Sequence, residues 1–549
     1  MVGVCALLAA GLLAAAGTES SPSLPPAEAT WRAVEVPGFV VVGPLDERSL
    51  QEVARRMATL RVVLSKLGTG LDLGGERPIP VYVFTAAEEF AKYAPSGKGS
   101  KDLGGYFATA YGYRAIAINF SSTAPFGTVY HELVHHVVHR NFGKVPTWFD
   151  EGIAGLYETF ECGSESVTIG RLSKRRLAWF ENHPLMPMRS LAEVTTDSSD
   201  YNESERAGTF YLQSLIAIHD LYFGRSPRAA QLPKYLEAVH AGVSPVAALD
   251  AFDGGAEGIG QEISGYLKAG QFPYVTMTFE QLKVPEAGRA RILPRQELLD
   301  SLGALALLAS PREPELAAAH FRASLAMESG RPRALAGLAV AAYASGDFAT
   351  ARAAADSSIA AGNDDPGIYL IGARAILRVE ERAHGETVNL DTPPSADVLK
   401  ARGWLQKAIT SDPSDGTALI SFGQTFLFGG GDPSPGIAAL ERADSLDRLD
   451  EHALSSLLEL RVRQGDRARA EALVENRLRP IASPAVMTEA IEALLRLDVE
   501  DANEAIRSKD YRRALALLRG VRDKTTNPGL KALVAERMSR LEAAASRQR

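Results

Sequence analysis

Cysteine is almost absent from this chain: its 549 residues include only Cys5 and Cys162. Cys5 lies in an N-terminal segment that we expect to be removed, so the mature chain would keep a single thiol and form no intrachain disulfide. A chain of this length is too long for one hydrophobic core. We therefore expect two or more domains.

Clusters of basic residues are also lacking. The formal net charge is −8 and the sequence pI is about 5.8. No group of lysines and arginines is interleaved with aromatic residues, and the short run Lys174-Arg175-Arg176 is typical of a solvated helix face. This charge distribution argues against a nucleic-acid partner and against binding to an anionic membrane surface.

Beyond the N-terminus, no apolar run is long enough to predict a transmembrane helix. Residues 2–16 form a short apolar run that ends in Ala14-Ala15-Ala16. This run predicts a signal peptide over residues 1–16 with a cleavage site of the A-x-A type, and a flexible Ser- and Pro-rich linker over 17–30. We therefore expect a bacterial protein exported to the periplasm or the cell exterior, with membrane anchoring through an uncleaved leader as the alternative.

The most informative motif is His131-Glu132-Leu133-Val134-His135. On a helix, residues i and i+4 lie on one face, so the two imidazoles can bind one Zn²⁺. Glu132 lies beside them as a candidate general base. The flanking residues are apolar, Pro125 suits a first helical turn, and Phe142-Gly143 suits a helix end.

A catalytic zinc ion needs a third protein ligand and one open position. His136 points about 100° away from His135 on the helix, and His139 lies one turn further along. No glycine turn precedes His139, as the metzincin pattern would require. The remaining isolated histidines are expected to be structural or surface groups: His219, His240, His320 and His452.

Glu151 is the better third ligand. Thr147 and Asp150 have the spacing of a capping box that would open a second helix, with Glu151 following in its first turn. Gly152 and Gly155 are small enough to let this helix pack close to the first one. Asp150 is a candidate partner that could orient an imidazole.

Taken together, HELVHH followed by PTWFDEGIAGLYE resembles the gluzincin branch of zinc peptidases, in particular peptidase-MA-like proteins. The resemblance covers residues 30–280. It implies one Zn²⁺ held by His131, His135 and Glu151, with Glu132 as base. It also implies a hydrogen-bond donor for the oxyanion. The segment around Tyr211 is similar to a Tyr-containing helix of this group, and Tyr157 is the alternative donor.

The expected mechanism is hydrolysis of a peptide bond without a covalent intermediate. Zinc lowers the pKa of a water toward about 7 and polarises the carbonyl. Glu132 takes the water proton and passes it to the leaving amine, while Tyr211 stabilises the oxyanion. Residues 115–120 predict a strand just before the active-site helix. This strand is either the sheet edge that receives the substrate backbone or a plain core strand.

The C-terminal half is rich in alanine, leucine and arginine and carries a degenerate repeat. Ala317 and Ala351 are 34 residues apart. The phrases Gly346-Asp347-Phe348-x-x-Ala351, Gly465-Asp466-Arg467-x-x-Ala470 and Lys509-Asp510-Tyr511-x-x-Ala514 share one pattern. The pattern resembles tetratricopeptide repeats, and we predict five to six helix pairs, with an insertion near residues 380–398.

These patterns predict an α+β zincin-like metallopeptidase domain over residues 31–284, a linker over 285–294 and an all-α solenoid of tetratricopeptide-like repeats over 295–549. The expected function is that of a secreted zinc metallopeptidase acting on a protein or peptide substrate. The repeats are expected to bind a partner or substrate, or only to pack on the peptidase or space it from a surface. The alternative is a catalytically inactive peptidase-like protein that acts as a repeat scaffold.

Overall fold

The chain consists of two compact units in a computed structural model, Met1–Ser329 and Gly330–Arg549, and each is described by itself. The predicted leader and the start of its linker lie outside the described residues. None of the helices in the described part is long and apolar enough to cross a membrane. The structure describes residues 24–26, 28–67, 71, 73, 78–95, 103–110, 113–123, 125–202, 204–225, 227–309, 314–384, 392–446 and 449–546.

A six-stranded mixed sheet forms the centre of the first unit, with strand order β4-β5-β3-β2-β1-β9. The neighbours β2, β3 and β5 are parallel, and the other neighbouring pairs are antiparallel. The strands are β1 Arg32–Val36, β2 Phe39–Gly43, β3 Ile79–Phe84, β4 Gly105–Ala110, β5 Tyr113–Asn119 and β9 Arg291–Ile292.

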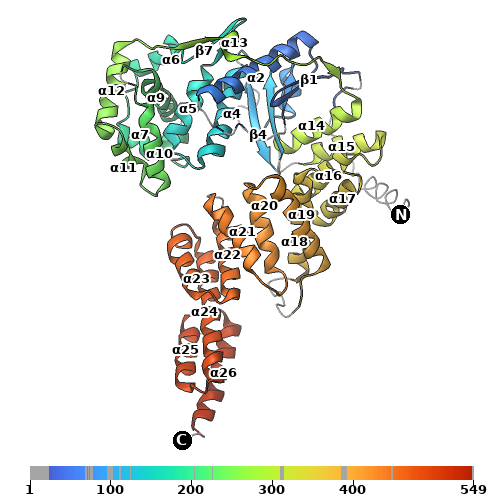
Figure 1. Ribbon diagram of the computed structural model, residues 1–549, viewed down its shortest axis with the longest axis vertical. Helices are drawn as coiled ribbons and strands as arrows, with labels where there is room; N and C mark the ends of the chain where they lie inside the picture. The colour runs from blue at the N-terminus through green and yellow to red at the C-terminus, as the bar shows by residue number, and fades with distance from the viewer. Residues whose placement is uncertain are drawn as a thin grey trace. The chain divides into compact units, whose positions relative to one another are not determined.

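Both faces of this sheet are covered by helices (Figure 1). Because side chains alternate along a strand, Val81 and Val83 point into the core that α2 (Glu47–Leu67) and α4 (Pro125–Phe142) share. Tyr82 points to the opposite face, where its hydroxyl donates to the carbonyl of Ser301 on α14 (Arg295–Ala309) at 2.9 Å.

The predicted strand at residues 115–120 is a core strand and not a sheet edge. β5 pairs with β3 on one side and with β4 on the other, and most of its residues are buried. The edge next to α4 is therefore β4, which pairs only with β5 in the described sheet. The alternation of apolar and small residues over 106–120 predicts one or two strands, and the segment holds two, β4 and β5.

Helices dominate the rest of the first unit. The exceptions are three short strands that form a second sheet: β6 Glu161–Cys162, β7 Ser166–Ile169 and β8 Val275–Thr278. The helices are α3 Ala87–Ala91, α5 Thr147–Glu158, α6 Lys174–Leu177, η1 Ala178–Glu181, α7 Met188–Glu193, α8 Ser199–Asn202, α9 Ser204–Phe223, η2 Ala229–Gln231, α10 Leu232–His240, α11 Pro245–Ala248, η3 Leu249–Ala251, α12 Gly255–Ala269 and α13 Phe279–Leu282.

The C-terminal half is an array of tetratricopeptide-like helix pairs, which confirms the predicted repeats. The first pair, α14 and α15 (Glu315–Met327), belongs to the first compact unit, whereas the predicted boundary between domains lies at 285–294. The later helices are α16 Pro332–Ala344, α17 Phe348–Ala360, α18 Pro366–His384, α19 Ala396–Ser411, α20 Gly416–Gln424, η4 Thr425–Leu427, α21 Ser434–Ser445, α22 Glu451–Gln464, α23 Arg467–Leu473, η5 Val474–Leu478, α24 Pro484–Arg507, α25 Tyr511–Lys524 and α26 Pro528–Ser546.

The repeated phrase marks the turn within a helix pair. Gly465 has a φ of 76°, which ends α22 in the left-handed region. Asp466 then caps α23 by accepting from the Arg469 N–H, and Ala470 is fully buried where the helices cross. The same roles fall to Gly346-Asp347-Ala351 and to Lys509-Asp510-Ala514.

The first repeat pair is joined to the sheet region through a buried histidine. His320 on α15 is fully buried, with its Nε2 2.9 Å from the Tyr93 hydroxyl and its Nδ1 2.8 Å from the Leu316 carbonyl oxygen. Both contacts suit a neutral imidazole that donates from Nδ1 and accepts at Nε2. Burial lowers the pKa of His320 from 6.5 to about 4.

We expect this histidine to make the first unit sensitive to acid. Between pH 6.5 and about 4 the unfolded chain binds a proton that the folded chain excludes, so stability falls as the pH is lowered through this window. The shift is worth up to about 3 kcal/mol. Thermal unfolding of the full chain between pH 7.5 and about 4 should therefore show a smaller loss for His320→Gln than for the wild type. The exposed His240→Gln is the control, and equal losses in wild type and His320→Gln would contradict this account.

Candidate metal centre

Two consecutive helices, α4 and α5, carry the predicted metal ligands. α4 runs from Pro125 to Phe142, as the sequence predicts, and Gly143 follows with a φ of 62° that favours glycine. Only residues 143–146 separate α4 from α5. The short turn brings α5 back against α4, so that Glu151 meets the histidine face of α4.

The predicted capping box is not formed. Pro146 occupies the N-cap of α5 without a side-chain cap, so the helix begins one residue earlier than expected and Thr147 is its first residue. The Asp150 carboxylate is therefore not part of a cap. Its Oδ1 lies 2.9 Å from Nδ1 of His135, and its Oδ2 lies 2.6 Å from Nε2 of His139.

Trp148 and Gly152 fix the position of α5. Trp148 is fully buried, and its Nε1 donates to the Tyr235 hydroxyl on α10 at 2.9 Å. A Cβ at Gly152 would lie 2.5 Å from the carbonyl oxygen of Ser214 on α9. Gly152 and Gly155 therefore allow close packing on α9, and the expectation that they serve the contact with α4 is wrong.

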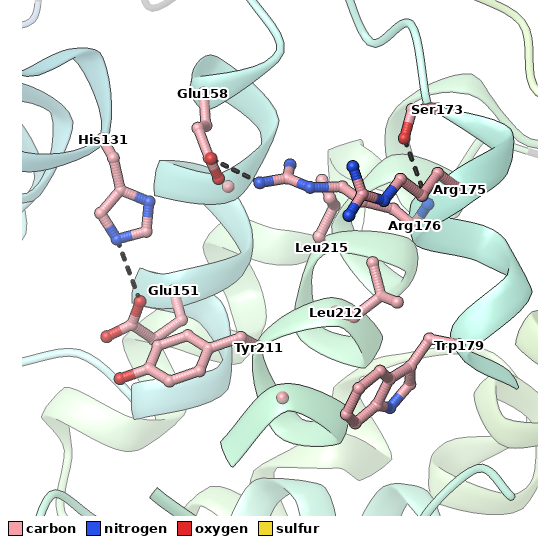
Figure 2. Close-up of a pocket in the computed structure, with 12 residues that line it drawn as sticks. His131, Glu151, Glu158, Ser173, Arg175, Arg176, Trp179, Tyr211, Leu212 and Leu215 are labelled. Carbon is pink, nitrogen blue, oxygen red and sulfur yellow. Dashed lines mark hydrogen bonds and ion pairs between the residues drawn. The ribbon is translucent and has the colours of Figure 1, made fainter. Parts of the chain in front are cut away.

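The predicted ligands converge on one point. His131 and His135 place their Nε2 atoms 3.0 Å apart. Oε2 of Glu151 lies 3.3 Å from the first of these nitrogens and 3.5 Å from the second. Figure 2 shows the His131 imidazole directed at the Glu151 carboxylate. The three atoms form a nearly equilateral triangle.

Tyr201 supports this triangle and was not found by sequence reasoning. It lies on the short helix α8, and its hydroxyl donates to Oε1 of Glu151 at 2.9 Å. This bond leaves Oε2 facing the imidazoles. Asp150 orients His135 from the other side of its ring. A proton on Nδ1 faces the Asp150 carboxylate, so that the lone pair of Nε2 points into the triangle.

The cluster attracts positive charge. Burial alone lowers the pKa of His135, but Asp150 and Glu151 outweigh it and raise that pKa to about 10. Burial raises the pKa of Glu151, but His131 and His135 bring it down to about 2. Both carboxylates therefore remain ionised at neutral pH, and a cation between them is favoured, whether a proton on an imidazole or a metal ion that displaces it.

The residues fit a zinc ion. Two imidazoles and one carboxylate form a donor set that is used for catalytic zinc. Ligand atoms around a tetrahedral ion with bonds of about 2.0–2.1 Å lie about 3.3–3.4 Å apart, close to the triangle found here. Three buried polar atoms at this site make no hydrogen bond of regular geometry: Nδ1 of His135 and Oδ1 of Asp150, which face each other at 2.9 Å as an ion pair, and Oε2 of Glu151. The last of these is the atom that a metal ion would satisfy.

A cavity of about 610 Å³ opens at the triangle (Figure 2). Tyr211 on α9 lines this cavity, and Figure 2 shows its hydroxyl beside the Glu151 carboxylate. Burial and the charges of Glu151 and Glu132 raise the pKa of Tyr211, although a hydrogen bond with Tyr201 lowers it. The hydroxyl therefore stays protonated and able to donate. Tyr157, the alternative donor, lies in the hydrophobic core and does not line the cavity.

The other histidines of α4 stay out of the triangle, as predicted from the helix geometry. His136 packs its ring against Phe107, with ring centroids 4.7 Å apart. His139 has 55% of its side chain exposed, and its Nε2 lies 2.6 Å from Oδ2 of Asp150, the oxygen that faces away from His135. Glu132, which follows His131 on α4, is partly buried.

The fold and the site define a chain with an α/β unit that holds a His-His-Glu cluster, followed by tetratricopeptide-like repeats. No family model and no curated protein matches the sequence. A thermophilic tetratricopeptide-repeat protein of Thermus thermophilus is 20% identical, with 36% of this chain and 99% of that chain covered and a TM-score of 0.26. A human IFIT1 dimer is 15% identical over 68% of this chain and 92% of that chain, with a TM-score of 0.22.

Removing the Tyr201 hydroxyl should weaken zinc binding. Tyr201→Phe keeps the ring but frees Oε1 of Glu151, so the carboxylate is no longer held toward the imidazoles. Loss of such an orienting partner costs about 10–100-fold in metal affinity. Competition with a chelator measures the effect, and Tyr222→Phe on the exposed side of α9 is the control. Equal zinc affinity in Tyr201→Phe and the wild type would show that the hydroxyl does not orient the ligand.

Proposed function

We propose that this chain is a zinc-dependent peptidase with a gluzincin-like, zincin-type catalytic domain. The observation that carries the proposal is the triangle of His131, His135 and Glu151, whose buried Oε2 lacks a hydrogen-bond partner. Asp150 and Tyr201 hold two of the three ligands from outside the triangle. A decayed site would have no need for this supporting set.

Two residues outside the triangle have roles in the proposed reaction, Glu132 and Tyr211. A bound zinc ion supplies Lewis-acid chemistry, which polarises a carbonyl and lowers the pKa of a water. Glu132 accepts the proton of the attacking water and delivers it to the leaving amine. Tyr211 donates its hydroxyl hydrogen bond to the oxyanion that forms on the substrate carbonyl.

The sheet edge offers a place for an extended substrate. β4 is the edge strand and packs against α4, the helix that carries both histidines. A peptide that adds to β4 would gain main-chain hydrogen bonds with little sequence selectivity. The sequence suggested residues 115–120 as the edge that receives the substrate. In our proposal residues 105–110 take this role.

The repeat array supports a role in protein interaction. Arrays of helix pairs present extended surfaces on which a protein or peptide can lie. We propose that the repeats of the second unit bind a partner or the substrate itself. We also propose export to the periplasm or the cell exterior. This part of the proposal rests on the leader sequence alone.

A repeat scaffold without catalysis is the competing function, and the repeat architecture favours an interaction role in either case. The scaffold and the peptidase differ in the role of the cluster of His131, His135 and Glu151. A scaffold would tolerate loss of Glu132, which is not a metal ligand, whereas a peptidase would lose turnover without it. Metal content and turnover must therefore be measured on the same variants.

Purified full-length protein should contain close to one zinc ion per chain by elemental analysis. Glu151→Ala removes one ligand and should lose the metal. Glu132→Gln should keep the metal and lose about 10²-fold or more in peptide hydrolysis, because the general base is gone. Glu158→Ala, a carboxylate in the same cavity but outside the triangle, is the control for zinc content. A wild type that takes up no zinc even after refilling would rule out the peptidase.

Tyr211→Phe tests the oxyanion donor separately from the metal. Zinc content should stay at the wild-type level, because Tyr211 holds no ligand atom of the triangle. The turnover number should fall by about 10²-fold with little change in KM, since the hydrogen bond forms only in the transition state. Steady-state kinetics on a cleaved peptide gives this result. A change confined to KM would assign Tyr211 to substrate binding instead.

A further inference from the structure

One wall of the cavity carries two arginines that the proposed reaction does not use. Arg175 and Arg176 lie on the four-residue helix α6 and line the same cavity as His131 and Glu151. The sequence suggested that this basic run is only a solvated helix face. All three side chains are exposed, and two of them, Arg175 and Arg176, also line the cavity that opens at His131 and Glu151, while Lys174 does not.

The charges on this wall do not cancel. Arg176 forms an ion pair with Glu158, and the Ser173 hydroxyl accepts from the Arg176 backbone N–H at 3.2 Å. The charge of Glu151 is compensated by the imidazoles. Arg175 makes no ion pair or hydrogen bond with any of the described residues, and Figure 2 shows its side chain next to that of Arg176. The cavity therefore keeps one uncompensated guanidinium, with five donors that suit a carboxylate.

The wall beside the arginines is apolar and held in place. Trp179 donates from Nε1 to the Thr209 hydroxyl at 3.0 Å and stacks on His183 with ring centroids 3.9 Å apart. A Cβ at Gly208 would lie 3.0 Å from the indole, so glycine lets the ring lie close to α9. Leu212 and Leu215 continue this surface toward the metal cluster.

A rigid apolar wall that ends in a free guanidinium matches an aliphatic stem that ends in a carboxylate. The wall takes up the methylene groups, and the guanidinium pairs with the charged end. Glutamate and aspartate side chains have this form. A free peptide C-terminus supplies the same carboxylate from a different source.

We infer that Arg175 selects peptides with a carboxylate close to the bond that is cut at the metal cluster. The inference rests on the proposed peptidase function, since it names the substrate class of that site. Arg176 serves this selection as a positioning residue, because its pair with Glu158 prevents that carboxylate from neutralising Arg175.

Binding to a non-cleaving full-length protein tests this inference without turnover. The protein carries Glu132→Gln, and the probes are three alanine pentapeptides studied by calorimetry. One is blocked at both ends with a central glutamate, its twin has a central glutamine, and the third has only alanine and a free C-terminus. We expect a carboxylate-bearing probe to bind about tenfold more tightly than the blocked glutamine peptide. The stronger of the two acidic probes identifies the source of the carboxylate.

Two charge reversals on α6 provide the matched comparison. Arg175→Glu should abolish or invert the preference, because it places a like charge where the carboxylate binds. Lys174→Glu makes the same change in net charge on the neighbouring residue and should leave the preference intact. Equal binding of all three probes, no binding up to millimolar concentration, or an unchanged preference in Arg175→Glu would each overturn the inference.

The proposed function fails in a different way. Cleavage that depends on Glu132 but shows no preference for a carboxylate would overturn the inference and leave the peptidase standing. A wild-type protein that holds zinc and prefers a carboxylate through Arg175, but hydrolyses no peptide, would overturn the proposed peptidase function instead. It would identify a carboxylate-binding site that does not catalyse hydrolysis.

Discussion

The buried carboxylate of Glu151 sets the geometry of the site. Only 5% of this side chain is exposed, and an unpaired buried charge costs several kcal/mol. Its partners come from two elements besides its own helix: Oε2 faces the imidazoles of α4, and Oε1 accepts from Tyr201 on α8. These contacts hold α4, α5 and α8 in one arrangement, because loss of any partner leaves a charge without compensation.

The same constraint explains the contacts on the other sides of α5. A helix that presents Glu151 to α4 must turn its remaining faces to other elements. Trp148 is anchored on α10, and the glycine at 152 allows α9 to approach until a Cβ would meet backbone. Because α9 also carries Tyr211, the close approach at Gly152 determines how near that hydroxyl comes to the ligands. The Trp-x-x-Glu-Gly pattern thus combines an anchor, the carboxylate that faces the two imidazoles and a point of close approach.

Local patterns in the sequence predicted the parts of the site that depend on helical spacing. The pairing of His131 with His135 and the exclusion of His136 follow from 3.6 residues per turn. The bounds of α4 follow from Pro125 at its start and Phe142-Gly143 at its end. The repeat phrase likewise encodes a left-handed residue, an aspartate cap and a buried alanine. Tyr201 and Arg175 could not be found this way, because each meets the site through tertiary packing of a short helix. The predicted cap at Thr147 is wrong for a local reason, since Pro146 occupies the N-cap and the helix starts one residue earlier than expected.

The first repeat pair shows how a helical repeat can become part of another domain. A single helix pair cannot bury its apolar face alone and needs a neighbour on each side. For α14 that neighbour is the sheet, through the contact of Tyr82 with Ser301, and for α15 it includes Tyr93 through His320. α14 also packs against β4 and β5. The edge strand that we propose for substrate binding therefore contacts both α4, which carries His131 and His135, and the first helix of the repeats.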